Sequence, residues 1–396
     1  MIAGIIGATG YVGAELVRLL CGHPEVNDLA LSSTSFEGQL LSDVYPNFLG
    51  RVGTKLLKAE DLIGESDVVF AALPNGMAEP FAERCMDKGI PFIDMSADFR
   101  FDDDEESYKA WYGKPYTNRD LHKNSVYGLC ELNRGKIQEK ARPSGLLSAI
   151  DGGKPEALIV GNPGCYPTCA SLAAYPALVK GLVGEGTIII DAASGVTGGG
   201  RELLRAYHFP ECNDSLTAYK VGAHRHTPEI SRNFRKMESP EKNRDGAKEY
   251  PAQMENERPI IFTPHLAPMN RGILATLYIG LAQKYQISRH DGASPRPPTK
   301  EIETLEDDIR TLYTQFYQNE QFVRVLPKGL YATTGRVRLS NYCDISTHID
   351  QSGRTLIVTA AIDNMIKGAA GQAVQNMNII FGFHENSGLE YIPALF

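Results

Sequence analysis

The sequence predicts an α/β protein of two domains: a doubly wound parallel sheet, and an α+β domain whose sheet is mixed or antiparallel. Its 396 residues exceed what a single ordinary hydrophobic core contains. Up to about residue 165, short apolar runs alternate with helical periodicity, which is typical of a parallel sheet with helices on both faces. Beyond that point strand-like runs follow one another without regular helices, which favours a second domain of another kind.

The elements can be placed in order along the chain. In the first domain we expect strands at residues 1–6, 29–33, 67–72, 91–95 and 158–160. In the second we expect a helix at 166–180, strands at 187–191, 259–263, 272–282 and 354–361, and a helix of small residues at 363–381. Stretches rich in charge, glycine or proline are expected to be surface insertions at 134–155, 237–258 and 288–299.

The composition argues against several classes of protein. A formal net charge of −8 disfavours a nucleic-acid or anionic-membrane binder, because phosphate contacts need clustered Lys and Arg. No apolar run approaches the roughly 18 residues of a membrane helix, and we expect no signal peptide before the first strand. The seven cysteines are scattered and include no Cys-x-x-Cys pair, so we expect no disulfide framework, no metal site and a cytoplasmic location.

A glycine-rich turn joins the first strand to a helical pattern. Glycines spaced Gly-x-x-Gly-x-x-Gly permit a tight turn, close approach of backbone to a pyrophosphate, and close packing of helix on strand. Free N–H groups at the helix start hold the phosphate charge. The order of strand, turn and helix therefore predicts a Rossmann-type dinucleotide site. Its expected contacts are Gly7, Thr9, Gly10, Tyr11, Val12 and Gly13.

The end of the second strand distinguishes NADP from NAD. NAD enzymes usually place Asp or Glu there, about 20 residues on, to bind the ribose 2′-OH. Here Ser32 and Ser33 offer hydroxyls, and no carboxylate would repel a 2′-phosphate. The sequence therefore favours NADP, with these serines as contacts, although no nearby arginine stands out as a phosphate clamp. A short-chain dehydrogenase is excluded, because no tyrosine has a lysine four positions later.

Cys165 is the candidate nucleophile. It follows an apolar strand and the turn Gly-Asn-Pro-Gly (161–164) and precedes a helical pattern, which places the thiol at or near a helix N-terminus. The dipole and unpaired N–H groups of such a terminus activate a thiol and stabilise an oxyanion. A buried structural cysteine is the alternative; this alternative suits Cys169, one turn further on.

A nucleophilic thiol needs a partner for proton transfer. Residues 224–226 read His-Arg-His, so two imidazoles flank one guanidinium. In an extended segment His224 and His226 would share one side and Arg225 would lie on the other. Metal binding is the alternative, but no third or fourth ligand with recognisable spacing appears.

With these residues assembled, the sequence resembles the N-acetyl-gamma-glutamyl-phosphate reductase family, oxidoreductases of arginine biosynthesis. The resemblance spans nearly the whole chain in order. It includes Asp-Met-Ser-Ala-Asp-Phe-Arg (94–100) and Ser-Gly-Val-Thr-Gly-Gly-Gly-Arg (194–201). Further motifs lie at 7–13, 127–132, 161–168, 224–230, 264–272 and 363–376. Together they are highly specific, whereas no single one would be.

The resemblance implies NADPH-dependent reduction of an acyl phosphate to an aldehyde through a thioester on Cys165, with His226 as general acid/base. It also implies a fold like that of aspartate-semialdehyde dehydrogenase, in a homodimer or homotetramer. Residues 1–164 plus 365–396 would bind NADP, with Asn376 near the nicotinamide, and residues 165–364 would form the catalytic and dimerisation domain. Candidate contacts to the substrate phosphate are Arg100 and Asn162. Candidate contacts to the rest of the substrate are Ser194, Arg201, Lys220 and Arg225.

Two departures from the family pattern concern loops and cofactor contacts: Asn75 stands where histidine is usual, and Cys130 where proline is common. A lysine-pathway relative or an aspartate-semialdehyde dehydrogenase would share the chemistry and differ in substrate. A non-catalytic NADP-sensing regulator would keep the glycine turn but needs no nucleophile. The motifs at 161–165 and 224–226 argue against that regulator.

Overall fold

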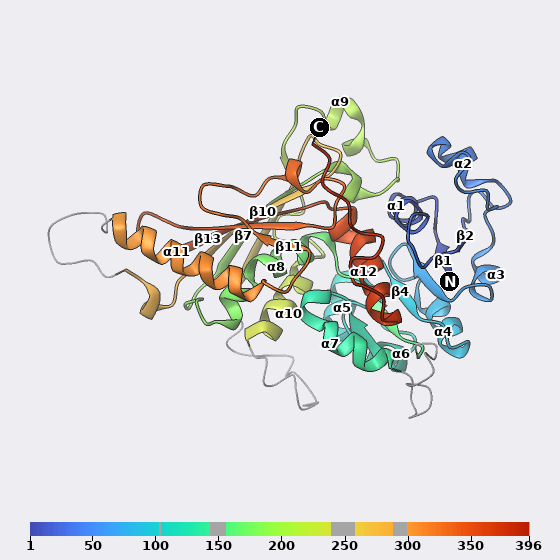
Figure 1. The fold of residues 1–396 in the computed structure, drawn as a ribbon, viewed down its shortest axis with the longest axis horizontal. Coiled ribbons are helices and arrows are strands. Elements are labelled where there is room, and N and C mark those ends of the chain that lie inside the picture. The colour runs from blue at the N-terminus through green and yellow to red at the C-terminus, as the bar shows by residue number, and fades with distance from the viewer. Residues whose placement is uncertain (103, 143–155, 239–257, 288–298, 396) are drawn as a thin grey trace. The chain divides into compact units, whose positions relative to one another are not determined.

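The computed structural model describes residues 1–102, 104–142, 156–238, 258–287 and 299–395 (Figure 1). The chain divides into two compact units. Unit 1 comprises Met1–Cys165, Gly199–Leu203 and Met365–Ile392. Unit 2 comprises Tyr166–Gly198, Leu204–Asn364 and Pro393–Phe396.

Unit 1 is built on a six-stranded sheet in the order β2-β1-β3-β4-β6-β5, with every pair parallel. The predicted parallel sheet is therefore confirmed, and its first four strands lie where the apolar runs indicated. The edge strand β5, which has only three residues, was not predicted from the sequence. The strands are β1 (Ile2–Ile6), β2 (Asp28–Ser32), β3 (Val68–Ala71), β4 (Phe92–Asp94), β5 (Ser125–Tyr127) and β6 (Ile159–Gly161).

Helices cover both faces of this sheet. On one face α3 and α4 share a buried apolar cluster with strand residues such as Val69 and Phe92. On the other, α12 contacts β4, α1 and α7. The helical elements are α1 (Tyr11–Leu20), α2 (Leu41–Val44), η1 (Pro46–Phe48), α3 (Ala59–Ile63), α4 (Glu79–Asp87), α5 (Glu105–Tyr112), α6 (Arg119–Asn124), α7 (Cys130–Ala141), η7 (Ile366–Ala370) and α12 (Gly371–Phe381).

Unit 2 is built on a seven-stranded sheet in the order β11-β12-β13-β10-β7-β9-β8. Strand β10 is antiparallel to both neighbours, whereas β7 with β9 and β11 with β12 are parallel, so the predicted mixed sheet is confirmed. The strands are β7 (Ile188–Ser194), β8 (Thr217–Ala218), β9 (Ile260–Leu266), β10 (Ile273–Gly280), β11 (Val323–Val325), β12 (Cys343–Ile349) and β13 (Thr355–Ile362).

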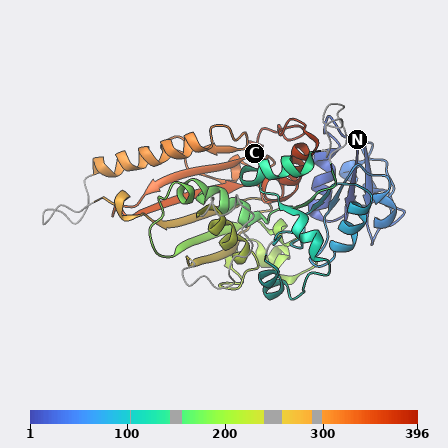
Figure 2. The ribbon, with the colours of Figure 1, turned by 90° about the horizontal axis from the view of Figure 1, so that it is seen from below.

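Two long helices pack together over the seven-stranded sheet. The hydroxyls of Tyr313 in α11 and of Tyr317, the residue after α11, donate to backbone carbonyls of α8 at 3.0 and 2.5 Å. Figure 2 shows α11 running alongside the strands. The helical elements are α8 (Cys165–Val179), η2 (Val196–Gly199), η3 (Arg205–Tyr207), α9 (Phe209–Cys212), α10 (Thr227–Glu238), η5 (Gln283–Tyr285), α11 (Thr299–Phe316) and η6 (Thr334–Arg336).

The three expected insertions have different outcomes. The prediction that the first insertion begins at residue 134 was wrong, because helix α7 continues to Ala141 and buries the side chain of Ile137. The remainder of that stretch, at 143–155, and most of the other two, at 239–257 and 288–298, lie outside the described residues.

The outward face of the seven-stranded sheet carries an apolar row across three strands. Ile189 of β7 pairs in register with Ile261 of β9 on one side and Tyr278 of β10 on the other. These side chains are 38%, 51% and 38% exposed, while all but one of their neighbours along the strands are buried; the exception, Ile260, is partly exposed. Within the part of the chain that the structure describes, no helix is long and apolar enough to span a membrane.

Candidate active site

The glycine turn lies at the carboxyl end of β1, where the strand order of the six-stranded sheet reverses. Gly7 has a φ of 83°, and a Cβ there would lie 2.4 Å from the carbonyl oxygen of Ala72. A Cβ on Gly13 would lie 2.2 Å from the carbonyl oxygen of Gly7. Helix α1 begins at Tyr11 without a side-chain cap, so its first N–H groups are donors suited to a phosphate. These residues fit a dinucleotide.

A cluster of polar groups surrounds Thr9 beside this turn. The Thr9 and Ser33 hydroxyls are 2.8 Å apart and buried, and Ser32 ends β2 next to them. The Thr9 carbonyl accepts hydrogen bonds from the Tyr45 hydroxyl at 3.0 Å and from Arg201 Nη1 at 3.1 Å. Arg201 thus lies at the nucleotide turn, because its segment folds with unit 1, and the substrate-carboxylate contact expected for it stays a prediction.

Cys165 is the first residue of the 15-residue helix α8, directly after β6 and a short turn, and it is partly exposed. The predicted place at a helix N-terminus is confirmed. Gly161, the last residue of β6, allows the neighbouring loop to come close, since a Cβ there would lie 2.1 Å from the Phe99 carbonyl oxygen.

The loop at 94–100 positions Arg100 beside the turn at 161–164 that precedes Cys165, which we call the cysteine turn. Asp94 accepts hydrogen bonds from the backbone N–H of Ser96 at 2.9 Å and from its hydroxyl at 2.8 Å, which closes the loop. Arg100 is 8% exposed. Its Nε donates to the Asn162 carbonyl at 2.8 Å and its Nη2 to the Met95 carbonyl at 3.0 Å. Arg100 therefore fixes the backbone immediately before the nucleophile.

The two amides expected at the ligands are interior scaffold groups. Asn162 is fully buried; its Nδ2 donates to the Ala369 carbonyl at 3.1 Å, and its Oδ1 accepts from Asn376 Nδ2 at 3.1 Å. Asn376 is equally buried and accepts a hydrogen bond from the Cys130 thiol, whose pKa burial raises. Both side chains join the cysteine turn to α12, and the phosphate and nicotinamide contacts expected of them stay predictions.

In unit 2, His224 and His226 lie in a turn before α10, so the extended segment expected for them was wrong. The turn nevertheless keeps the imidazoles adjacent. Their ring centroids are 4.9 Å apart, and His226 donates its backbone N–H to His224 Nδ1 at 3.1 Å. Tyr166 makes edge contacts with both rings at 5.6 and 5.9 Å.

Two candidate substrate cations share this environment. Burial, followed by the charges of Lys220 and Arg225, lowers the pKa of His224 to about 4, so its imidazole is neutral at pH 7. Burial and Arg225 likewise lower the pKa of Lys220. Lys220 has a φ of 45°, a left-handed conformation that costs a non-glycine residue about 1–2 kcal/mol. Strain of this kind is characteristic of functional sites.

Ser194, the third polar candidate of unit 2, ends β7 and is 3% exposed. Its hydroxyl donates to the Gly195 carbonyl at 3.2 Å. The substrate contact expected of it stays a prediction.

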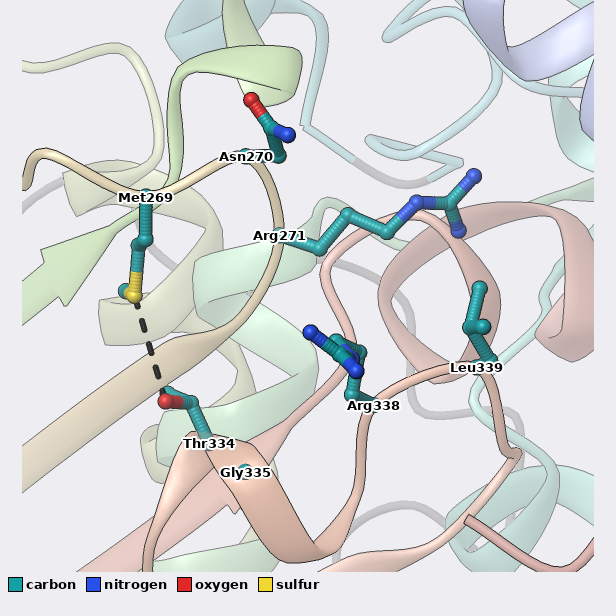
Figure 3. A pocket seen from close by; sticks show the side chains of 7 residues that line it. All are labelled: Met269, Asn270, Arg271, Thr334, Gly335, Arg338 and Leu339. Atoms are coloured by element: carbon teal, nitrogen blue, oxygen red, sulfur yellow. Dashed lines mark hydrogen bonds between the residues drawn. The ribbon is translucent and has the colours of Figure 1, made fainter. Parts of the chain in front are cut away.

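A hollow of about 380 Å³ lies elsewhere in unit 2 (Figure 3). The charged residues that line it are Arg271 and Arg338. Arg271 Nη1 lies 3.6 Å from the buried carboxylate of Asp363. Neither arginine is among the site residues predicted from the sequence, although Arg271 stands in the motif at 264–272. The lining residues are Met269, Asn270, Arg271, Thr334, Gly335, Arg338 and Leu339. Among described residues, no cluster of three or more His, Cys, Asp or Glu side chains could hold a metal ion.

Comparisons with known proteins agree with this geometry. The model of the semialdehyde dehydrogenase NAD binding domain matches residues 2–140, and that of the semialdehyde dehydrogenase dimerisation domain matches residues 165–364. Aspartate semialdehyde dehydrogenase II of Vibrio cholerae, complexed with ASA, superposes with a TM-score of 0.63 at 14% identity, over 96% of this chain and 97% of that one. The Candida albicans enzyme with NADP gives 0.62 at 17%, over 96% and 98%. The chain is an oxidoreductase of the semialdehyde dehydrogenase class.

Closer relatives narrow this class. The N-acetyl-gamma-glutamyl-phosphate reductase of Clostridium beijerinckii is 44% identical over 393 residues, which is 99% of each chain. That of Brachyspira hyodysenteriae is 41% identical over 393 residues, again 99% of each. The chain belongs to the N-acetyl-gamma-glutamyl-phosphate reductase family.

Proposed function

We propose that this chain reduces N-acetyl-gamma-glutamyl phosphate to N-acetylglutamate semialdehyde and phosphate, with Cys165 as covalent nucleophile, in arginine biosynthesis. The observation that carries the proposal is the position of Cys165, partly exposed as the first residue of α8. Helix N–H groups at that point stabilise both a thiolate and an oxyanion on the attacked carbonyl. Relatives at 41–44% identity over 99% of the chain support the substrate.

NADP fits the glycine turn of unit 1. The N–H groups at the start of α1 would hold the pyrophosphate, and Gly7 and Gly13 keep the space that side chains would fill. The Ser33 hydroxyl, 2.8 Å from that of Thr9, follows the end of β2, where an NAD enzyme has a carboxylate. When bound, NADPH supplies the hydride that this reduction consumes.

The chain's own groups account for the other steps. The Cys165 thiolate attacks the acyl carbon, the bond from that carbon to the phosphate oxygen breaks, and inorganic phosphate leaves a thioester on Sγ. After reduction, the bond to Sγ breaks, which releases the aldehyde and restores the thiolate. His226 carries the proton between the substrate oxygen and Sγ as the carbon–sulfur bond breaks. Lys220 and Arg225 bind the substrate carboxylate, and Arg100 holds the turn that presents Cys165.

Each unit then has its own task. Residues 1–164 with 365–396, together with the segment Gly199–Leu203 that folds with unit 1, form the NADP-binding domain, and the rest of residues 165–364 forms the catalytic and dimerisation domain. We infer that the row of Ile189, Ile261 and Tyr278 is covered by a second copy of this chain in a homodimer or homotetramer. Two observations support this inference. The exposed positions of three neighbouring strands carry apolar side chains, and they lie in a stretch that matches a family model of a dimerisation domain.

The test is reduction of NADP by the purified protein with N-acetylglutamate semialdehyde and phosphate, beside aspartate semialdehyde. Selective activity that requires phosphate is expected with the acetylated substrate. Activity with aspartate semialdehyde alone would keep the mechanism and overturn the substrate. Cys165→Ser should abolish turnover while binding of NADPH, followed by its fluorescence, is retained. Ordinary turnover by that variant would overturn the thioester.

A further inference from the structure

Arg201 is fixed against the nucleotide turn by groups that leave its charge available. Its guanidinium carbon lies 5.0 Å from the centroid of the Tyr45 ring and 5.7 Å from that of Phe36. One N–H donates to the Thr9 carbonyl at 3.1 Å, and the Tyr45 hydroxyl donates to the same oxygen at 3.0 Å. A ring contact and one hydrogen bond orient a guanidinium without neutralising it.

The charge of Arg201 is not balanced locally. No carboxylate among the described residues forms an ion pair with it, and its side chain is exposed. Other arginines of unit 1 do bond to carboxylates, as Arg18 does to Glu15 and Arg134 to Glu385, at 2.6 and 2.8 Å. A stacked and unneutralised guanidinium is suited to a polyanionic group of a ligand.

The neighbours of Arg201 identify that group. The Thr9 carbonyl belongs to the glycine turn, and the Thr9 hydroxyl meets Ser33 at the carboxyl end of β2. In a Rossmann-type domain this point lies beside the adenosine ribose, where a carboxylate selects a 2′-OH and an arginine accommodates a 2′-phosphate.

We propose that Arg201, together with the hydroxyl of Ser33, binds the 2′-phosphate of NADP and thereby sets the preference for NADP over NAD. The inference rests on the proposed cofactor site and assigns its specificity to a residue distant from it in sequence. The guanidinium offers two parallel N–H bonds to phosphate oxygens, and the serine hydroxyl offers a third donor. Lysine could supply the charge but neither the fork nor the stacking geometry.

The experiment measures binding of two fragments by titration calorimetry, adenosine 2′,5′-bisphosphate and 5′-AMP, which differ only in the 2′-phosphate. The wild-type chain should prefer the bisphosphate. Arg201→Met should weaken bisphosphate binding about 10- to 150-fold, as expected for charged hydrogen bonds, and change 5′-AMP binding less than about threefold. Arg201→Lys should fall between. The matched control Arg205→Met removes an exposed arginine that pairs with Glu211, and it should bind both fragments as the wild type does.

Equal losses for both fragments in Arg201→Met, or no loss for either, would overturn the inference, as would a wild type without preference for the bisphosphate. In steady state, KM for NADPH should rise in Arg201→Met while kcat/KM with NADH is kept. A wild type that shows an Arg201-dependent preference but no turnover with N-acetylglutamate semialdehyde would support this inference and contradict only the proposed substrate.

Discussion

His226 donates its backbone N–H to Nδ1 of His224 at 3.1 Å, which makes that ring nitrogen an acceptor and leaves the His224 proton on Nε2. The neutral form is also favoured by burial and by the charges of Lys220 and Arg225. His224 therefore holds the turn in which His226 stands, and the two imidazoles have different tasks.

The first prediction concerns stability against pH. The pKa of His224 is about 4 in the folded chain against 6.5 as its ordinary value, so the unfolded chain binds the extra proton between these values. The contribution of His224 to the free energy of unfolding is fully present above pH 6.5. It is lost as the pH falls toward 4, and the loss amounts to up to about 3 kcal/mol. In His224→Asn the amide oxygen can still accept the His226 N–H, and that part of the slope should vanish. Parallel curves of denaturation midpoint against pH for the two proteins would contradict this.

The second prediction separates the two histidines by rate. His226→Ala should lower kcat by about 10²- to 10⁴-fold, because it removes the group that transfers protons. Its denaturation midpoint should remain near that of the wild type, since the His226 side chain is only partly buried. A negligible change in kcat would move the proton-transfer role to His224.

The third prediction tests the close approach behind the cysteine turn. Gly161→Ala would place a Cβ 2.1 Å from the Phe99 carbonyl oxygen, where only backbone could yield. We expect a loss of about 1–3 kcal/mol in the free energy of unfolding, as for overpacked cores, together with reduced activity. Gly135→Ala is the matched control: it lies exposed in α7 with no atom near its Cβ, and it should stabilise the helix by up to about 1 kcal/mol. Equal effects of both changes would refute the steric account.

The sequence predicts much of the fold because its signals are local. Glycine spacing at 7–13 and apolar runs before and after it define β1, α1 and β2, and the turn at 161–164 places Cys165 at a helix start. Elements with weaker local signals were missed. Strand β5 has three residues and gains its identity from pairing with β6, while α11 buries only Ile309 and Tyr313 along eighteen residues.

Site details depend on contacts that no local pattern encodes. Arg201 meets Thr9 across 192 residues, so a motif alone could not assign it to the nucleotide turn. Asn162 and Asn376 meet across 214 residues, and their burial follows from the packing of α12. Residues 224–226 alternate in type as a strand would. The proline after Thr227 suits the first turn of a helix, however, and α10 begins at Thr227, so no strand forms there.

The fourth prediction concerns assembly. Ile261→Asp places a charge in β9 at one end of the apolar row of Tyr278, Ile189 and Ile261, and burying it against a second copy would be costly. Light scattering after size-exclusion chromatography should therefore show single chains for this variant and multiples for the wild type. Leu49→Asp, at an exposed apolar position of unit 1, should leave the mass of the assembly unchanged. An unchanged mass for Ile261→Asp would place the interface elsewhere.

The fifth prediction addresses the buried charge that joins η7 to α7. Lys367 Nζ lies 2.6 Å from Glu131 Oε1, with both side chains at most 1% exposed, and it also donates to Gln375 Oε1 at 2.8 Å. Lys367→Met should destabilise unit 1 by about 3–5 kcal/mol, because Glu131 loses its counter-charge in the interior. This loss is measured by denaturant unfolding, monitored through the hydrogen exchange of backbone amides in α7 and α12. The double change Lys367→Met with Glu131→Leu should recover much of it, since no uncompensated charge is then buried. If the double variant were as unstable as the single one, the loss would stem from packing around Lys367 and not from the charge left on Glu131.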